Sequence, residues 1–472
     1  MNAPLYADAV VRSISPAAHL ARAAGRRLVR LAGSGATDRY DRRFYPQRFD
    51  EPIEQALPRM RAPRRARRED AVPHVVHVIG SLGAGGAERQ LAAFIAASQR
   101  SGLARHTVVT CHAAVGAAGH HRRVLEDAGV AIRTAGERAG EQALARIRAD
   151  RALRRRMFAI PLGLGHEPVE IAGEFIDLEP DIVHAWLDHT NVFAGAAAIA
   201  TGVPEVILSL RSLAPTHFPA MLRAWMQPWY AALAREDNVR LVANSEAGAG
   251  DYARWIGIER ARIGVVRNGF DAGQFVDPAP AEVGRVRDGL GAAGRPLVLG
   301  VFRVGDEKNP HHFVHVARRV LRARPECVFA VAGDGPMLSE TRRFTEDLGG
   351  SFVTLGRRED VPALLGAADA VLHCSRVEGL PNVLVEAQAL GCPVVATDAG
   401  GTREAIAPGA TGFLRPVGDV AGLADDVLRL LGDAELRAAM SARARAFARE
   451  RFPLGRMVRE THGLYGVDDG GL

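Results

Sequence analysis

Short runs of apolar residues alternate with longer amphipathic stretches along most of this chain. The apolar runs lie at 74–79, 107–111, 130–134, 181–186, 204–210, 240–245, 296–301, 328–332, 353–356, 370–374 and 393–397. Such runs, bounded by Gly, Pro or polar residues and separated by segments of helical periodicity, are typical of parallel strands buried on both faces. We therefore predict an α/β fold built on parallel sheets.

Composition and charge narrow the class of protein. The length of 472 residues favours two domains plus an appendage, and 47% hydrophobic with 24% charged residues indicates a globular chain. Residues 1–70 contain 15 Arg and 8 acidic residues, whereas the whole chain has a net charge of only +6. The remainder is therefore nearly neutral, and we expect no nucleic-acid partner. The four Cys show no metal or redox spacing, and we find neither a signal-peptide core nor a membrane span, which together favour the cytoplasm.

The basic N-terminal extension, residues 1–70, has a pattern of its own. Residues 10–31 place apolar side chains at helical spacing, with Arg mostly elsewhere. A basic amphipathic helix of this kind is typical of a segment that lies on an anionic membrane surface. The alternatives are a helix docked on the body or a partly disordered tail. The Pro- and Arg-rich residues 58–73 read as a flexible linker, and we expect the extension to be dispensable for folding.

The most informative stretch is the loop and helix between the apolar runs 370–374 and 393–397. Glu378 lies in the loop, Pro381 suits the first helical turn, and Asn382 and Glu386 share one helix edge at a spacing of i,i+4. The N-terminus of the helix favours a phosphate group. The two carboxylates suit hydrogen bonds from sugar hydroxyls beside that phosphate.

Two cations follow the apolar run 296–301. Arg303 comes two positions after it, and Lys308 precedes a predicted helix that begins near Pro310. The chain has 59 Arg but a single Lys, which indicates that a compact ammonium is required at position 308. An Arg and a Lys converging at a strand end and a helix N-terminus predict a diphosphate clamp.

The spacing of Glu378 and Glu386, with Gly379, Leu380, Pro381 and Asn382 between them, resembles the signature of the retaining glycosyltransferases of family 4. The resemblance extends over residues 74 to about 460. It implies the GT-B fold, in which two Rossmann-like domains face a cleft. The domains expected here are 71–272 for the acceptor and 273–452 for the nucleotide-sugar, with 453–472 crossing back to the first.

The resemblance also implies roles for individual residues. Glu378 would contact the donor sugar, and Glu386 the ribose of the nucleotide. Arg303 and Lys308 would hold the donor diphosphate. The donor-binding set implied by the resemblance comprises Gly85, Gly86, Arg357, Gly379, Leu380, Pro381, Asn382 and Glu386. A tight turn without a ligand is the alternative for the glycine loop.

The acceptor side of the cleft is less clear. Asp188 and His189 follow the apolar run 181–186, where parallel sheets place ligand groups. Many family members carry a functional His after the next strand, but this chain has Arg211 there. His189 and Arg211 are therefore competing candidates, with Asp188 beside them. We count His189 with Arg303, Lys308 and Glu378 as the catalytic set.

The resulting functional hypothesis is the transfer, with retention, of a sugar from a nucleotide diphosphate to a glycan or lipid-linked acceptor in cell-surface polysaccharide synthesis. No Asp-x-Asp pair is present in the sequence, so the expected reaction uses no metal and no cofactor beyond the donor substrate. Two alternatives remain, a nucleotide-sugar epimerase of the same fold and a non-catalytic subunit that binds nucleotide-sugars.

Overall fold

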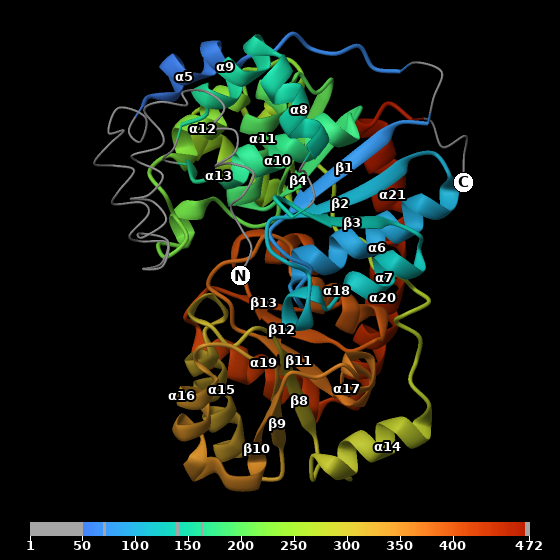
Figure 1. The fold of residues 1–472 in the computed structure, drawn as a ribbon. Coiled ribbons are helices and arrows are strands. Elements are labelled where there is room, and N and C mark those ends of the chain that lie inside the picture. The colour runs from blue at the N-terminus through green and yellow to red at the C-terminus, as the bar shows by residue number, and fades with distance from the viewer. Residues whose placement is uncertain (1–50, 69–71, 138–140, 162–163, 468–472) are drawn as a thin grey trace.

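The computed structural model describes residues 51–68, 72–137, 141–161 and 164–467. Two parallel α/β domains lie one above the other, with the first domain at the top of Figure 1. The predicted fold class, two Rossmann-like domains facing one another, is confirmed. The amphipathic stretch at 10–31 lies outside the described residues.

The first sheet has the strand order β3-β2-β1-β4-β5-β6-β7, and every neighbouring pair is parallel. Its strands are β1 (His74–Ile79), β2 (Arg105–Thr110), β3 (Ala131–Thr134), β4 (Ile182–Trp186), β5 (Glu205–Leu210), β6 (Val239–Ala243) and β7 (Ile263–Val265). The order reverses between β1 and β4. In doubly wound sheets the crevice at such a reversal, outside the carboxyl ends of the strands, receives the ligand.

The second sheet repeats this topology in the order β10-β9-β8-β11-β12-β13. Its strands are β8 (Leu297–Val301), β9 (Val328–Ala332), β10 (Phe352–Gly356), β11 (Ala370–His373), β12 (Val394–Thr397) and β13 (Gly412–Arg415). The reversal lies between β8 and β11, so the residues after these two strands share one edge. The edge strand β13 was not expected from the sequence, because Gly-Phe-Leu-Arg is short and lacks a buried apolar run.

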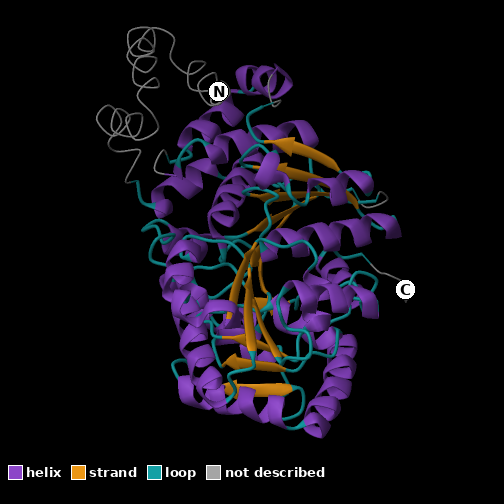
Figure 2. Ribbon diagram, turned by 90° about the horizontal axis from the view of Figure 1, so that it is seen from below, coloured by secondary structure: helices purple, strands orange, loops and turns teal. Residues whose placement is uncertain are grey.

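Helices cover both faces of each sheet (Figure 2). Those before the second sheet are α5 (Ile53–Met60), α6 (Gly86–Ser101), α7 (Arg122–Asp127), α8 (Glu141–Ala149), α9 (Arg151–Ala159), α10 (Glu167–Leu178), α11 (Asp188–Thr201), α12 (Met226–Leu233), α13 (Glu246–Ile256) and α14 (Pro280–Gly289). The later ones are α15 (Pro310–Ala323), α16 (Leu338–Phe344), α17 (Val361–Ala367), α18 (Asn382–Ala389), α19 (Val420–Gly432), α20 (Ala434–Arg451) and α21 (Leu454–Leu464). Helices α8 and α9 are separate because Asp150 caps the start of α9 through its carboxylate.

Residues 51–68 are docked on the first domain, unlike the flexible linker expected from Pro and Arg content. Helix α5 buries Ile53, Leu57 and Met60 in the first-domain core. Beyond it, the backbone N–H of Ala62 donates to the carbonyl of Ile199 at 2.9 Å. Four arginines then pair with acids of the first domain: Arg61 with Glu236, Arg64 with Asp237, Arg67 with Glu205 and Arg68 with Asp181. The acidic partners of these arginines are distant in sequence. The composition of the segment therefore gave no sign of the ion pairs and suggested a flexible linker.

The chain crosses between the domains twice, and the two crossings pair with each other. The N–H of Phe270 donates to the carbonyl of Phe452 at 2.9 Å, and that of Leu454 to the carbonyl of Phe270 at 3.1 Å. Helix α21 then packs against α6 of the first domain, where Tyr465 is fully buried. A Cβ on Gly269 would lie 2.7 Å from Cα of Leu454, so the crossing segments meet closely enough to require glycine there.

Within the described part of the chain, every helix is too short or too polar to cross a lipid bilayer.

Candidate active site between the two domains

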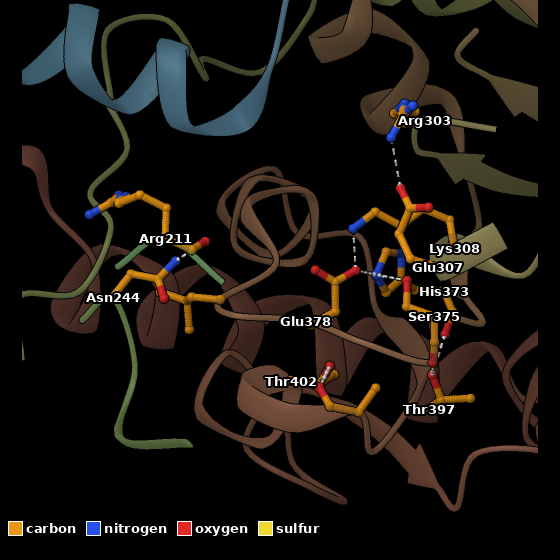
Figure 3. Close-up of polar contacts among 12 residues, drawn as sticks. Arg211, Asn244, Arg303, Glu307, Lys308, His373, Ser375, Glu378, Thr397 and Thr402 are labelled. Atoms are coloured by element: carbon orange, nitrogen blue, oxygen red, sulfur yellow. Dashed lines mark hydrogen bonds and ion pairs between the residues drawn. The ribbon is translucent and has the colours of Figure 1, made fainter. Parts of the chain in front are cut away.

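The loop between β11 and α18 forms the centre of the candidate site (Figure 3). Nζ of Lys308 donates to Oε1 of Glu378 at 2.6 Å, and Nε2 of His373 lies 2.7 Å from the same oxygen. Since a carboxylate only accepts, the imidazole carries its proton on Nε2. The hydroxyl of Ser375 is 2.9 Å from that nitrogen. Glu378 is therefore held in place by two donors before any ligand arrives.

These contacts decide the charge of Glu378. Burial alone would raise the pKa of its carboxyl group, but the Lys308 ammonium and the His373 hydrogen bond outweigh it and hold the pKa well below its usual range. The side chain of Glu378 is 7% exposed and that of Lys308 22% exposed. At neutral pH the site thus presents an ionised carboxylate beside an ammonium.

Arg303 lies on the same side of Glu378 as Lys308 (Figure 3). It follows β8 and contacts Glu307, with 3.4 Å between Nη1 and Oε1. Its side chain is 65% exposed, so the guanidinium can leave this surface pair for an anionic ligand at little cost. The structure thus brings Arg303, Lys308 and Glu378 together at the reversal point of the second sheet.

Glu386 is held from the opposite domain. It lies one turn into α18 and pairs with the guanidinium of Arg89 on α6. Burial raises the pKa of the Glu386 carboxyl group, and Arg89 lowers it in part. Asn382, at the start of α18, donates to the carbonyl of Gly86 at 3.4 Å. The glycine loop before α6, which includes Gly85, therefore faces the N-terminus of α18 across the domain boundary.

Gly379 lies where the backbones of the two domains meet. A Cβ there would be 2.9 Å from the carbonyl oxygen of Arg211 and 2.8 Å from Cα of Ser212. Next to it, Nδ2 of Asn268 donates to Oδ1 of Asn382 at 2.6 Å and to the carbonyl of Leu380 at 3.4 Å. Pro381 forms the N-cap of α18. These contacts fix the loop against the first domain.

Two acceptor-side candidates, Asp188 and His189, are consecutive residues at the start of α11 and contact different neighbours. Oδ1 of Asp188 accepts hydrogen bonds from the hydroxyls of Tyr230 and Tyr252, and burial raises the pKa of this carboxyl group. The His189 ring lies edge-on to Trp225, with centroids 5.5 Å apart. In the described chain, no contact joins Asp188 or His189 to Glu378 or Lys308.

Arg211, unlike Asp188 and His189, lies beside the Glu378 loop. Its side chain donates to Oδ1 of Asn268 and stacks over Trp186, with 4.7 Å from the guanidinium carbon to the ring centre. Arg357, after β10, contacts Nδ1 of His120 in the first domain. Both arginines thus reach the boundary between the domains, one at each side.

Several residues of the site were missed by the sequence analysis. His373 and Ser375 precede Glu378 by only five and three positions, so a His at the end of an apolar strand was an available signal. Arg89, Asn268 and Glu404 act across the boundary. Glu404 accepts from the backbone N–H groups of Glu246 and Ala247 at the start of α13, each at 3.0 Å. Local sequence carries no sign of that contact.

No three His, Cys, Asp or Glu side chains converge on a possible metal position in the described ranges. The boundary between the two domains does contain a carboxylate pair, a Lys and an Arg around a helix N-terminus, facing a glycine loop on the other domain. Two doubly wound domains with such a site define the class of GT-B glycosyltransferases.

The comparisons with known proteins give the family. The model for glycosyl transferases group 1 matches residues 286–447, and that for glycosyltransferase family 4 matches residues 84–274. A glycogen synthase of Mycobacterium tuberculosis is 31% identical over 312 residues, covering 62% of this chain and 71% of that protein. The chain belongs to the family 4 glycosyltransferases, as the sequence signature predicted.

Two further relatives add detail. The Vi polysaccharide biosynthesis protein VipC/TviE of Salmonella typhi is 30% identical over 286 residues, 59% of this chain and 49% of that protein. The chain spans about half the length of several curated relatives that it matches. The crystal structure of Anabaena Alr3699/HepE in complex with UDP and glucose superposes with a TM-score of 0.67 at 22% identity, over 84% of this chain and 99% of that one. This likeness shows the fold.

Proposed function

We propose that this protein transfers a sugar from a nucleotide-diphosphate sugar to a hydroxyl of a glycan or lipid-linked acceptor, with retention, in cell-surface polysaccharide synthesis. The observation that carries the proposal is the Lys308–Glu378 contact of 2.6 Å at the start of α18, with Arg303 beside it. Two relatives support it, since one is a polysaccharide biosynthesis protein and one was crystallised with UDP and glucose.

The proposed donor site uses the charges of the second domain. The diphosphate binds Arg303, Lys308 and the N-terminal N–H groups of α18, which stabilise the charge that builds on the leaving group. Glu378, already ionised and positioned, accepts hydrogen bonds from hydroxyls of the transferred sugar. Glu386 accepts from the ribose, so donor binding replaces its contact with Arg89.

The proposed reaction proceeds on one face of the sugar. Glu378 and Glu386 each hold a cation and Asp188 holds two tyrosines, so none of these three carboxylates is placed as an unpaired nucleophile. The departing phosphate would then take the proton of the attacking hydroxyl, and the enzyme would supply orientation and charge stabilisation. Arg303 and Lys308 would do the work of a metal ion, so we propose a metal-independent transfer in the cytoplasm, at the inner face of the membrane.

The two alternatives make different products. An epimerase would convert a free nucleotide-sugar without an acceptor. A non-catalytic subunit would bind the nucleotide-sugar and release nothing, but the donor-side set of Arg303, Lys308, Glu378 and Glu386 is complete. These contacts favour transfer.

The test is a screen of nucleotide-sugars with the full-length protein, first by thermal shift and then by release of nucleoside diphosphate with polyprenyl-diphosphate-linked sugars and glycans as acceptors. We expect release that depends on the acceptor, persists in EDTA and gives a product with the anomeric configuration of the donor. Isomerised donor without acceptor would favour the epimerase. Activity abolished by EDTA and restored by Mg²⁺ or Mn²⁺ would contradict metal independence.

A further inference from the structure

A cation without an acidic partner lies in the first-domain wall of the cleft. Arg211 follows β5, its guanidinium stacks on Trp186, and its one side-chain hydrogen bond goes to Oδ1 of Asn268. Its Nε is shielded from solvent and makes no hydrogen bond. Within the described ranges, no Asp or Glu forms an ion pair with Arg211. The contacts it does have are an amide and an aromatic ring, and both are neutral.

Three other cations at the domain boundary each have an acidic partner. Lys308 pairs with Glu378, Arg89 with Glu386 and Arg303 with Glu307. Burial lowers the pKa of Arg211 to about 9, which still leaves the side chain protonated at neutral pH. Arg211 is half-buried, and a half-buried charge without a counterion is costly, whereas a neutral residue would pack against Trp186 without this cost. A guanidinium held here therefore indicates a ligand that supplies the missing negative charge.

The position of Arg211 says which part of a ligand it would meet. Its hydrogen-bond partner Asn268 also donates to Leu380 and Asn382. The backbone carbonyl oxygen of Arg211 lies against Gly379. The backbone of Arg211 is thus adjacent to the loop of Glu378, and its guanidinium extends away from Glu378 and Lys308, on the first-domain side (Figure 3). The diphosphate clamp is on the far side of that loop. A group at Arg211 would therefore belong to the sugar end of the bound substrates.

We propose that Arg211 binds the carboxylate of an acidic sugar, so that one substrate of this enzyme is a uronic acid. The proposal rests on the proposed function and names the chemistry of its substrate. A planar carboxylate matches the parallel N–H groups of a guanidinium. Among the described residues, Nε of Arg211 has no hydrogen-bond partner. The carboxylate can come from the donor sugar or from the accepting residue, because both meet in the cleft.

The test compares matched neutral and acidic ligands on the full-length protein by titration calorimetry. The donor arm uses UDP-glucose against UDP-glucuronate, UDP-galactose against UDP-galacturonate, and GDP-mannose against GDP-mannuronate. The acceptor arm adds methyl glucoside or methyl glucuronide to protein saturated with UDP or GDP. The variants are Arg211→Gln and Arg211→Lys, with Arg254→Gln as the matched control, since Arg254 is an exposed residue paired only with Asp251 on the surface.

We expect the acidic member of at least one pair to bind about tenfold more tightly to the wild type, as a charge-assisted bidentate contact allows. Arg211→Gln should remove this preference, Arg211→Lys should keep part of it, and both should bind UDP or GDP alone within about twofold of the wild type. Arg254→Gln should behave like the wild type. Circular dichroism of each variant verifies folding, and the Lys variant retains the charge if the Gln variant unfolds.

Three results would overturn the inference. The wild type could show no acidic preference in either arm, or Arg211→Gln could keep the preference. Alternatively, Arg211→Gln could weaken UDP or GDP alone as strongly as the acidic sugar, which would assign Arg211 to the diphosphate. Equal binding of neutral and acidic donors would leave the proposed transferase function standing, whereas failure to bind any nucleotide-sugar would contradict both.

Discussion

The two walls of the cleft carry their charges in different ways. On the second-domain wall, Lys308, Glu378 and His373 bond to one another within a single domain, so the group is assembled before a ligand binds. On the first-domain wall, Arg89 reaches across to Glu386, and Arg211 pairs with no acid of the described residues. A preassembled wall suits a constant ligand such as a nucleotide diphosphate. On the first-domain wall, Arg211 has no acidic partner in the described part of the chain, and Arg89 pairs with the other domain. Such charges suit a ligand that the protein must distinguish from similar molecules.

The largest effect that we predict comes from removing the cations of the second-domain wall. Lys308→Ala and Arg303→Ala should each lower kcat/KM by about 10²-fold or more, because the charge on the leaving diphosphate loses its stabilisation. Lys308→Arg should restore little, since the planar guanidinium does not replace a compact ammonium beside Glu378. Arg319→Ala is the control, because Arg319 is exposed on α15. Near-normal transfer by both alanine variants would show that the clamp is not where the charge is stabilised.

The two domains should also respond differently to acid. The first domain buries His106 and His184, and burial, the main cause for each, lowers both pKa values to about 3. Both rings are neutral in the folded protein but protonate near pH 6.5 when unfolded, so the unfolded state binds more protons as the pH falls. Stability should fall from pH 7 to 5 by about 2 kcal/mol for His184 alone.

The second domain contains Glu378, whose low pKa moves the loss of stability to a lower pH. Its contribution to stability is present above about pH 4.5, its unfolded pKa, and is lost only below that value. Hydrogen exchange followed by mass spectrometry at pH 7, 6 and 5 measures each domain separately. We expect β1, β2 and β4 to lose protection before β8 and β11. Simultaneous loss in both sheets, or none by pH 5, would contradict this difference.

Changing the Arg89–Glu386 contact between the two domains should have a smaller effect on nucleotide binding. Glu386→Gln should weaken binding of the nucleoside diphosphate by about tenfold, the value of one charge-assisted hydrogen bond. Arg89→Ala leaves Glu386 buried without its cation, which raises the pKa of that carboxyl group further. Nucleotide affinity of Arg89→Ala should then fall as the pH is lowered from 8 to 6, while that of the wild type changes less. If the double variant shows the sum of the single effects, the two side chains act independently.

The sequence was most informative where the site is local in the chain. Glu378, the start of α18, Glu386 and the nearby strands lie within a short segment, so periodicity and helix-end preferences define them. The fold class followed from the same patterns. Arg89 and Glu386 are 297 positions apart, and the two tyrosines that bond to Asp188 are 42 and 64 positions from it. Contacts at such separations depend on packing, which hydrophobic patterning does not encode.

Two other differences have the same physical origin. Residues 58–68 looked like a linker because their arginines have acid partners only in distant parts of the first domain. The strand β13 forms by pairing with the free edge of β12, where Phe413 lies opposite Val395. In each case the segment has weak local signals and is defined by the surface to which it binds.

The central claim is that the donor nucleotide binds mainly to the second-domain wall. Hydrogen exchange of the full-length protein measured with and without the nucleoside diphosphate selected by the thermal-shift screen tests it most directly. We predict that added nucleotide protects the backbone of residues 303–309 and 376–386, around Arg303, Lys308 and Glu378, and that Lys308→Ala loses this protection at the same concentration. Protection confined to the first domain, or protection unchanged in Lys308→Ala, would contradict the account.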